Sequence, residues 1–187
     1  MGRRFKITLT SIAPTNATYG GTYTVTATGG ASGNPVTFSV VAMSVCTVTG
    51  SAVTFTGVGI CTIDANQAGN AHYLPAIQLQ QGIVVGKAAT ILVAAPVSVV
   101  GSLLSVSVTF SGTLNSVTTG KGIAGQIVTF SDGPATCSAT TNASGVASCS
   151  VSVLDVVALL ISTSYSAIYA EGPDYFASSA TGKVTLL

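Results

Sequence analysis

The chain has 187 residues, but only six are Lys or Arg and five are Asp or Glu, which leaves a net charge of +1. With 48 % hydrophobic residues it is too apolar and too weakly charged for intrinsic disorder, and six basic residues do not make a surface for nucleic acid. A membrane-spanning helix needs about 20 unbroken apolar residues; the densest stretch, 151–161, is interrupted by Ser152 and Asp155.

The polar half of the chain is mainly Ser and Thr, with 21 Gly residues among them. Val and Thr favour strands because branched side chains pack well on a pleated sheet, and Gly supplies turns. This composition predicts an all-β protein. Soluble domains usually carry a charged surface that opposes association, so a surface of hydroxyls and methyl groups predicts a secreted protein that packs against other protein.

The N-terminal segment concentrates the positive charge, since Arg3, Arg4 and Lys6 are half of the basic residues. A signal peptide would continue with an apolar run of about 7 to 15 residues. Residues 7–12 alternate instead and predict a strand. Either a signal has been removed, or the chain is a fragment excised from a longer protein.

Period-2 alternation follows along the chain, with apolar residues on one face and hydroxyls on the other. The clearest examples are 22–28, 105–111 and 148–153. Such strands have one buried and one solvated face, as in antiparallel sheets. Turn signals separate them at 19–21, 29–35, 57–59, 131–134, 142–145 and 171–174. Many short strands at this spacing predict a sandwich or a barrel.

A weak internal repeat divides the chain. The sequence Val-Thr-Phe-Ser at 36–39 recurs at 128–131, and each half contains two cysteines and ends in a glycine turn followed by an aromatic residue. The join is expected near 86–89. We therefore predict two tandem immunoglobulin-like β-sandwiches, residues 1–87 and 88–187.

The four cysteines allow three pairings. A hairpin centred on Ala143 would place Cys137 directly opposite Cys149, at a separation that suits a disulfide. Cys46 and Cys61 both fall on the inward-facing positions of their alternating strands. They can bridge the sandwich if the chain crosses between sheets after the strand at 53–55. We expect both bonds. The alternatives are reduced, buried thiols or a metal site, although the C-x2-C spacing of zinc sites is absent. Disulfides indicate an oxidising, extracellular location.

Several segments of the first half resemble the bacterial Ig-like repeat of large surface proteins: 19–28, 35–39, 46–50 and 59–73. The second half is similar to a sister group at 125–131, 140–147 and 165–175. The resemblance implies tandem Ig-like modules of the kind found in adhesins, stalks and surface layers, and it carries no catalytic residue. Relatives are usually long repeat arrays, whereas this chain has two units.

Few residues are candidates for chemistry. His72 is the only histidine and lies in a predicted turn without a second histidine to complete a metal site. Asp64 is expected to point outward from a strand, and Asp155 to lie in a loop. Glu171 and Asp174 are close enough in sequence to share a calcium ion, but calcium takes about six to eight oxygen ligands. We therefore expect no catalytic, cofactor-binding or metal-binding residues.

Two functions from different classes remain, and an enzyme ranks behind both. The first is an extracellular structural protein that self-associates into a filament, stalk or surface layer. Its support includes apolar residues expected on both faces of their strands, at Val97, Val99 and Val100 and at 156–161. The extended segment Arg3–Ile12 is a candidate strand donor to a neighbouring copy. The second is an adhesin or carbohydrate-binding module with an unknown surface or glycan ligand, although the chain has no Trp.

Overall fold

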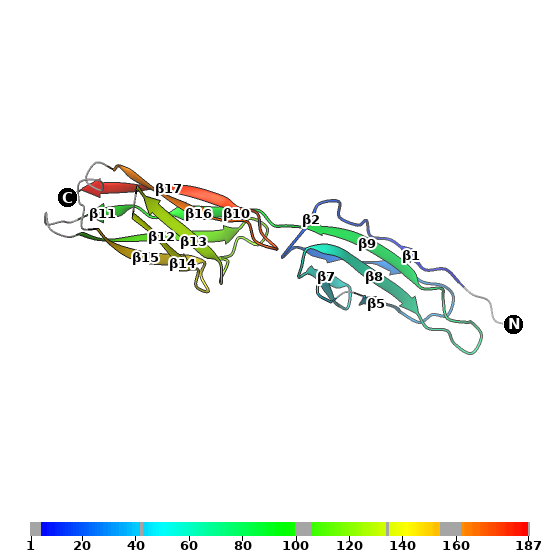
Figure 1. The fold of residues 1–187 in the computed structure, drawn as a ribbon. Helices are drawn as coiled ribbons and strands as arrows, with labels where there is room; N and C mark the ends of the chain where they lie inside the picture. The colour runs from blue at the N-terminus through cyan, green and yellow to red at the C-terminus, as the bar shows by residue number, and fades with distance from the viewer. Residues whose placement is uncertain (1–4, 42, 100–105, 134, 154–161, 187) are drawn as a thin grey trace. The chain divides into compact units, whose positions relative to one another are not determined.

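The computed structural model describes residues 5–41, 43–99, 106–133, 135–153 and 162–186. Every regular element in these ranges is a strand, which confirms the predicted all-β class. The described residues contain no helix that is long and apolar enough to cross a membrane. The chain divides into two compact units, Met1–Lys87 and Ala88–Leu187 (Figure 1), which we call unit 1 and unit 2.

Unit 1 is a sandwich of a four-stranded and a three-stranded sheet. Its strands are β1 (Thr8–Leu9), β2 (Ala17–Thr18), β3 (Thr22–Thr24), β4 (Ala27–Thr28), β5 (Val36–Val40), β6 (Cys46–Thr49), β7 (Ala52–Phe55), β8 (Gly59–Gln67) and β9 (Leu79–Gly86). The larger sheet has the order β2-β9-β8-β5, the smaller one β3-β7-β6, and β1 pairs with β4. Alternating apolar residues from both sheets form one core, which includes Val25, Val53, Phe55, Ile63 and Ile83.

The single strand predicted over 22–28 is wrong, because the structure divides it into β3 and β4. β3 pairs with β7, whereas β4 pairs with β1. Val25 lies between them with 0 % exposure, and its N–H donates to the carbonyl of Ser51 at 2.9 Å. The chain therefore changes its partner strand at a buried valine.

The N-terminal segment is shorter as a strand than predicted, and it is bound to its own unit. Within 7–12, only Thr8–Leu9 forms a strand, β1, which is antiparallel to β4. Ile7 is 3 % exposed, and the Thr10 N–H donates to the Thr26 carbonyl at 2.8 Å. A strand donated to a neighbour would first have to break these contacts.

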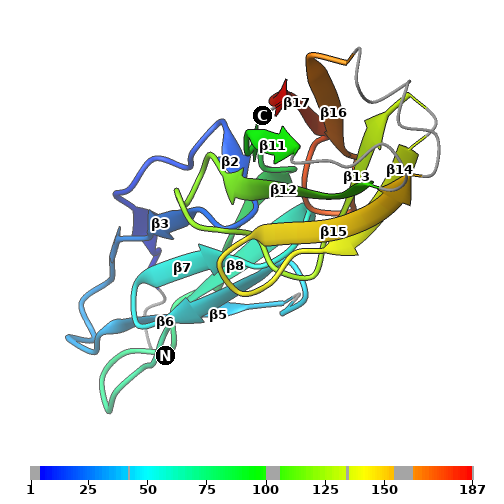
Figure 2. The same ribbon diagram turned by 90° about the vertical axis from the view of Figure 1, so that its left-hand side faces the viewer.

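Unit 2 is a sandwich of a three-stranded and a five-stranded sheet. Its strands are β10 (Thr90–Ala94), β11 (Val97–Val99), β12 (Val106–Ser116), β13 (Ile127–Asp132), β14 (Ala135–Thr140), β15 (Val146–Val153), β16 (Ser164–Tyr169) and β17 (Ser178–Leu186). The orders are β10-β12-β15, with β12 and β15 side by side in Figure 2, and β11-β17-β16-β13-β14. Two sandwiches of packed sheets agree with the predicted Ig-like fold class.

Three aromatic rings fill the centre of unit 2. Phe110 of β12 lies 4.7 Å from Tyr165 of β16 between ring centroids, and Phe130 of β13 lies 6.2 Å from the same ring. The Tyr165 hydroxyl lies 2.5 Å from the Ala95 carbonyl oxygen and 2.8 Å from that of Ser111. Tyr165 is 1 % exposed, so its polar atom is satisfied by backbone rather than by water.

Val97 and Val99 do not supply the exposed apolar surface that we expected from the sequence. They are 8 % and 4 % exposed, because β11 pairs in parallel with β17 and turns both side chains into the core. Ser98, between them, is exposed. Val100 and residues 156–161 lie outside the described residues.

Candidate functional site

His72 lies in a turn between β8 and β9. The Asn70 side-chain oxygen accepts hydrogen bonds from the backbone N–H groups of His72, at 2.9 Å, and Tyr73, at 3.0 Å. His72 itself is exposed. Among the residues described, no three His, Cys, Asp or Glu side chains gather where a metal ion could be held. The surroundings of His72 are those of a turn residue.

The carboxylates considered in the sequence lie in both units. Asp64 is partly buried on β8, and its Oδ1 accepts a hydrogen bond from the Gln80 amide of β9 at 2.8 Å. Glu171 and Asp174 lie between β16 and β17. Burial, followed by the negative charges of Asp174 and Glu171, raises the pKa of the Tyr169 phenol above its usual value. Asp155 lies outside the described residues.

The first disulfide joins the two sheets of unit 1. Cys46 of β6 and Cys61 of β8 have their sulfur atoms 1.97 Å apart, and both residues are 0 % exposed. β6 and β7 belong to the three-stranded sheet, whereas β8 belongs to the four-stranded one. The chain therefore crosses between sheets after Phe55, which brings the two cysteines face to face across the core.

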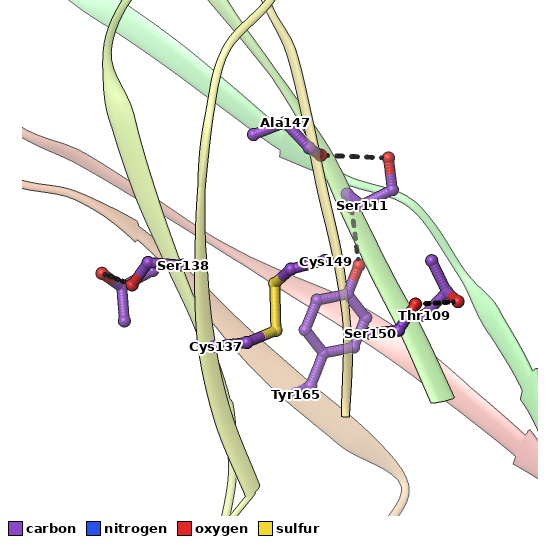
Figure 3. The surroundings of a disulfide bond; sticks show 9 residues. Thr109, Ser111, Cys137, Ser138, Ala147, Cys149, Ser150 and Tyr165 are labelled. Carbon is purple, nitrogen blue, oxygen red and sulfur yellow. Dashed lines mark hydrogen bonds between the residues drawn. A yellow bond between two sulfur atoms is a disulfide. The ribbon is translucent and has the colours of Figure 1, made fainter. Parts of the chain in front are cut away.

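The second disulfide also spans two sheets, and here the hairpin argument is wrong. The sulfur atoms of Cys137 and Cys149 are 2.05 Å apart, and Figure 3 shows the bond between their strands. β14 pairs with β13 and β15 pairs with β12, so the cysteines are not cross-strand neighbours in one ladder. The Asn142 side chain accepts the N–H groups of Ser144 and Val146 and shapes a turn that leads from one sheet to the other. Both cysteines are partly buried.

The outward faces of unit 2 carry many hydroxyl groups. Neighbouring strands pair these side chains directly. The pairs are Thr109 with Ser150 at 2.7 Å (Figure 3), Thr129 with Ser138 at 3.0 Å, and Ser131 with Ser166 at 2.6 Å. A Thr opposite a Ser on antiparallel strands is thus a recurrent hydrogen-bonded pair in this protein.

Unit 1 has an apolar patch on the outward face of its four-stranded sheet, formed by Val41, Ile60 and Val84. Ile60 of β8 is paired directly with Val84 of β9, and the two are 62 % and 72 % exposed. Val41 follows β5, is 63 % exposed, and is attached to β8 through its N–H, which donates to the Thr62 carbonyl at 3.1 Å. Ile60 and Val84 are direct cross-strand neighbours, and Val41 lies opposite Thr62 on the adjacent strand. Exposed aliphatic side chains grouped on one sheet face are typical of an interface.

The free edge of the same sheet borders a groove. β5 is the last strand of the order β2-β9-β8-β5. Beside it lies a groove of about 340 Å³, which is lined by Val36, Thr37 and Phe38 of β5 and by Gly50 and Ser51 of the turn between β6 and β7. Polar backbone of an edge strand and apolar side chains therefore meet at one place.

Comparisons with known proteins find structural similarity alone. No family model and no curated protein matches the chain. Similar solved structures include domains D00–D0 of intimin, with 13 % identity, a TM-score of 0.32, and 96 % of this chain and 99 % of that chain covered. Domains D0–D1 of intimin have 17 % identity, a TM-score of 0.30, and 95 % and 97 % covered.

A third similar structure is the Yersinia pseudotuberculosis adhesin InvE, with 15 % identity and a TM-score of 0.34. The match covers 96 % of this chain but 58 % of that protein, so the chain spans little more than half its length. Two of the three similar structures are thus domains of intimin, and the third is an adhesin. Because the identities and TM-scores are this low, the function of the chain is inferred from its own residues.

Neither the patch nor the groove was predicted from the sequence. A signal for the patch was present, because Ile60 and Val84 stand beside inward-facing residues: Cys61 and Ile63 on β8, and Ile83 and Val85 on β9. An apolar residue out of phase with a clear alternation indicates an exposed apolar side chain. The groove has no such signal, since it depends on which strand ends the sheet.

Proposed function

We propose that the chain is a non-catalytic, extracellular structural protein that associates with copies of itself and serves as a building block of a filament, stalk or surface layer. The observation that carries this proposal is the apolar patch of Val41, Ile60 and Val84 on an outward sheet face. Fully burying a Val or Ile side chain is worth about 1.5–3 kcal/mol. More than half of each side chain is still exposed, so most of that gain is available to an interface.

The charge of the chain does not oppose such contact. The net charge is +1. Colloidal repulsion between copies is therefore weak. Association through apolar side chains should also persist at high salt, because salt screens charge pairs but not hydrophobic contacts.

The extracellular location is supported by the cysteines. All four are paired in the structure, and no free cysteine remains among the described residues. Disulfides of this kind persist in oxidising compartments and are rare in the cytosol. The turn that holds His72 and the hydrogen bond from Gln80 to Asp64 support a non-catalytic role in that location.

The patch offers a route to association that leaves the N-terminal segment in place. Donating residues 3–12 to a neighbour would break the pairing of β1 with β4 and uncover Ile7. Contact through Val41, Ile60 and Val84 breaks no bond of the fold. We therefore assign the association to the patch rather than to a donated strand.

Sedimentation velocity over a concentration series tests the proposal. The wild-type chain should form dimers or larger species, and the double variant Ile60→Lys/Val84→Lys should associate much more weakly at the same concentrations. The matched control, Thr136→Lys/Thr181→Lys, adds the same charge at exposed hydroxyl positions of unit 2 and should associate like the wild type. A wild-type chain that stays monomeric at millimolar concentration would refute self-association.

An adhesin or carbohydrate-binding module is the second candidate, favoured by Phe176. This ring is 50 % exposed in the segment before β17, and exposed aromatic rings are common platforms for ligands. A glycan array with the wild-type chain and with Phe176→Ala tests it. Glycan binding that the variant loses, by a chain that is monomeric, would place this function first.

A further inference from the structure

The edge of β5 that faces away from β8 carries unpaired backbone groups. The Val41 N–H donates to Thr62 of β8, and antiparallel ladders alternate between bonded and non-bonded residues. Counting back from Val41, Ser39 and Thr37 therefore bond to β8. The N–H and C=O groups of Val36, Phe38 and Val40 then point away from β8, and no other strand pairs with that edge in the part of the chain that the structure describes.

The inward side chains of β5 are also incompletely covered. On the neighbouring β8, residues 61, 63, 65 and 67 are all buried. On β5, the inward residues 36, 38 and 40 are only partly buried, and the groove of about 340 Å³ lies against the first two. An added strand would therefore gain both backbone hydrogen bonds and apolar contact.

Natural edge strands are usually protected from pairing by charged side chains, by bulges or by covering elements. The sequence of β5, Val-Thr-Phe-Ser-Val, contains no charge, and the strand pairs regularly with β8. Among the described strands, none covers its outer edge. In unit 2, by contrast, the edge strands β14 and β15 are joined to each other by the disulfide of Cys137 and Cys149.

We propose that β5 pairs antiparallel with β5 of a second copy, centred on Phe38, so that two four-stranded sheets become one continuous sheet. This inference rests on the self-association proposed above and names a second contact for it. In this register Val36 lies opposite Val40 of the second copy, and Phe38 lies opposite its own counterpart. Each of these facing pairs can exchange N–H···O bonds in both directions. The partly buried apolar side chains of both strands then cover one another at the groove.

The sequence of β5 favours a second copy over an unrelated peptide because the strand is self-complementary. Its apolar positions 36, 38 and 40 are symmetric about Phe38. Its two outward residues also match, because Thr37 of each copy lies opposite Ser39 of the other copy. That is the same Thr–Ser pair that joins Thr109 to Ser150 at 2.7 Å and Thr129 to Ser138 at 3.0 Å in unit 2.

The symmetry of this contact determines what it can build. An isologous contact closes into a dimer and does not propagate. The apolar patch lies on the outward face of the same sheet, whereas the β5 contact runs along its edge. A protein with one edge contact and one face contact has the two different interfaces that an extended assembly needs.

A pair of variants that differ only in the sign of one charge tests the register. Thr37→Lys/Ser39→Lys places ammonium groups opposite each other in both facing pairs. Thr37→Glu/Ser39→Lys places a carboxylate opposite an ammonium instead. Position 39 is changed to Lys in both variants because it faces Asp64 on β8, where a new carboxylate would destabilise the fold. Circular dichroism and thiol titration verify that both variants fold and keep their disulfides.

Sedimentation velocity should show that the Lys/Lys variant associates about tenfold more weakly than the wild type, and the Glu/Lys variant within about threefold of it. Added salt should weaken association of the Glu/Lys variant alone. If both variants associate like the wild type, the contact lies elsewhere and the β5 proposal fails while self-association stands. If both lose association equally, the antiparallel register is wrong. A monomeric wild type would overturn both proposals.

Discussion

The hydroxyl of Tyr165 provides a sharp test of what holds unit 2 together. The substitution Tyr165→Phe removes one oxygen and leaves the ring between Phe110 and Phe130 unchanged in shape. That oxygen lies between the carbonyls of Ala95 and Ser111. The Ser111 carbonyl keeps the Ala95 N–H as a donor at 2.9 Å, so the loss falls mainly on the carbonyl of Ala95.

Leaving this part-buried acceptor without its donor costs about 1–3 kcal/mol, and we expect about 2 kcal/mol here. For a domain of this size that is a fall in the melting temperature of roughly 8–16 °C. Differential scanning calorimetry of the full chain, with its disulfides intact, measures the transition of unit 2.

The control is Tyr169→Phe, which removes the same atom from another position of β16. Its hydroxyl lies 3.1 Å from the side-chain oxygen of Gln126, and a side-chain amide can reorient towards water. We expect a loss of about 1 kcal/mol or less. If Tyr165→Phe lowers the stability no more than Tyr169→Phe, the backbone contacts of Tyr165 do not have the role assigned to them.

Three further predictions concern the disulfides, one glycine and alkaline pH. Reductant should open the partly buried Cys137–Cys149 bond before the fully buried Cys46–Cys61 bond, because access to the sulfur atoms limits thiol exchange. Alkylation followed by mass spectrometry gives the order, and simultaneous opening of both bonds would contradict the prediction. Gly182→Ala should destabilise unit 2 by about 1–3 kcal/mol in urea unfolding, since a Cβ at this position overlaps the Tyr165 ring. The control Gly82→Ala should be close to neutral in the same assay, because its Cβ meets Ile60 at an ordinary contact distance of 3.8 Å. Burial raises the pKa of the Tyr165 phenol against the lowering effect of its backbone hydrogen bonds, so the folded state holds the proton more tightly than the unfolded chain does. The resulting stability is present below pH 10 and is lost as pH rises through the folded pKa of the phenol. Absorbance at 295 nm follows the ionisation of the phenol, and the urea midpoint follows the stability. A urea midpoint that does not change at alkaline pH would contradict the prediction.

Alternation in the sequence predicts which side of a strand faces inward. The phase places Cys46, Cys61 and Val25 on inward faces, and the structure buries all three. The same phase does not say which sheet a strand joins. A short turn can return a strand to its own sheet or carry it to the opposite one, and at Asn142 the second occurs.

The exposed surface is harder to predict from the sequence for the same reason. From the sequence, Val97 and Val99 are expected to add to the exposed apolar surface. In the structure, pairing of their strand with β17 turns both side chains into the core. Ile60 and Val84 lie in strands whose neighbouring residues fill the core, so they are left outside. Burial of a residue depends on its neighbours in space, and those are set by sheet order rather than by local pattern.

The cross-sheet disulfides also determine how far each unit can lengthen under tension. A chain pulled from both ends can extend each residue to about 3.3–3.6 Å, but residues between bonded cysteines are bypassed. The bond of Cys46 and Cys61 has a sequence separation of 15, and that of Cys137 and Cys149 has 12. Each unit, once unfolded, therefore stays shorter by about 45 Å and about 35 Å respectively than its reduced form. A protein held at a cell surface would thus meet a mechanical stop before its full contour length, and reducing agents would act on its reach as well as on its stability.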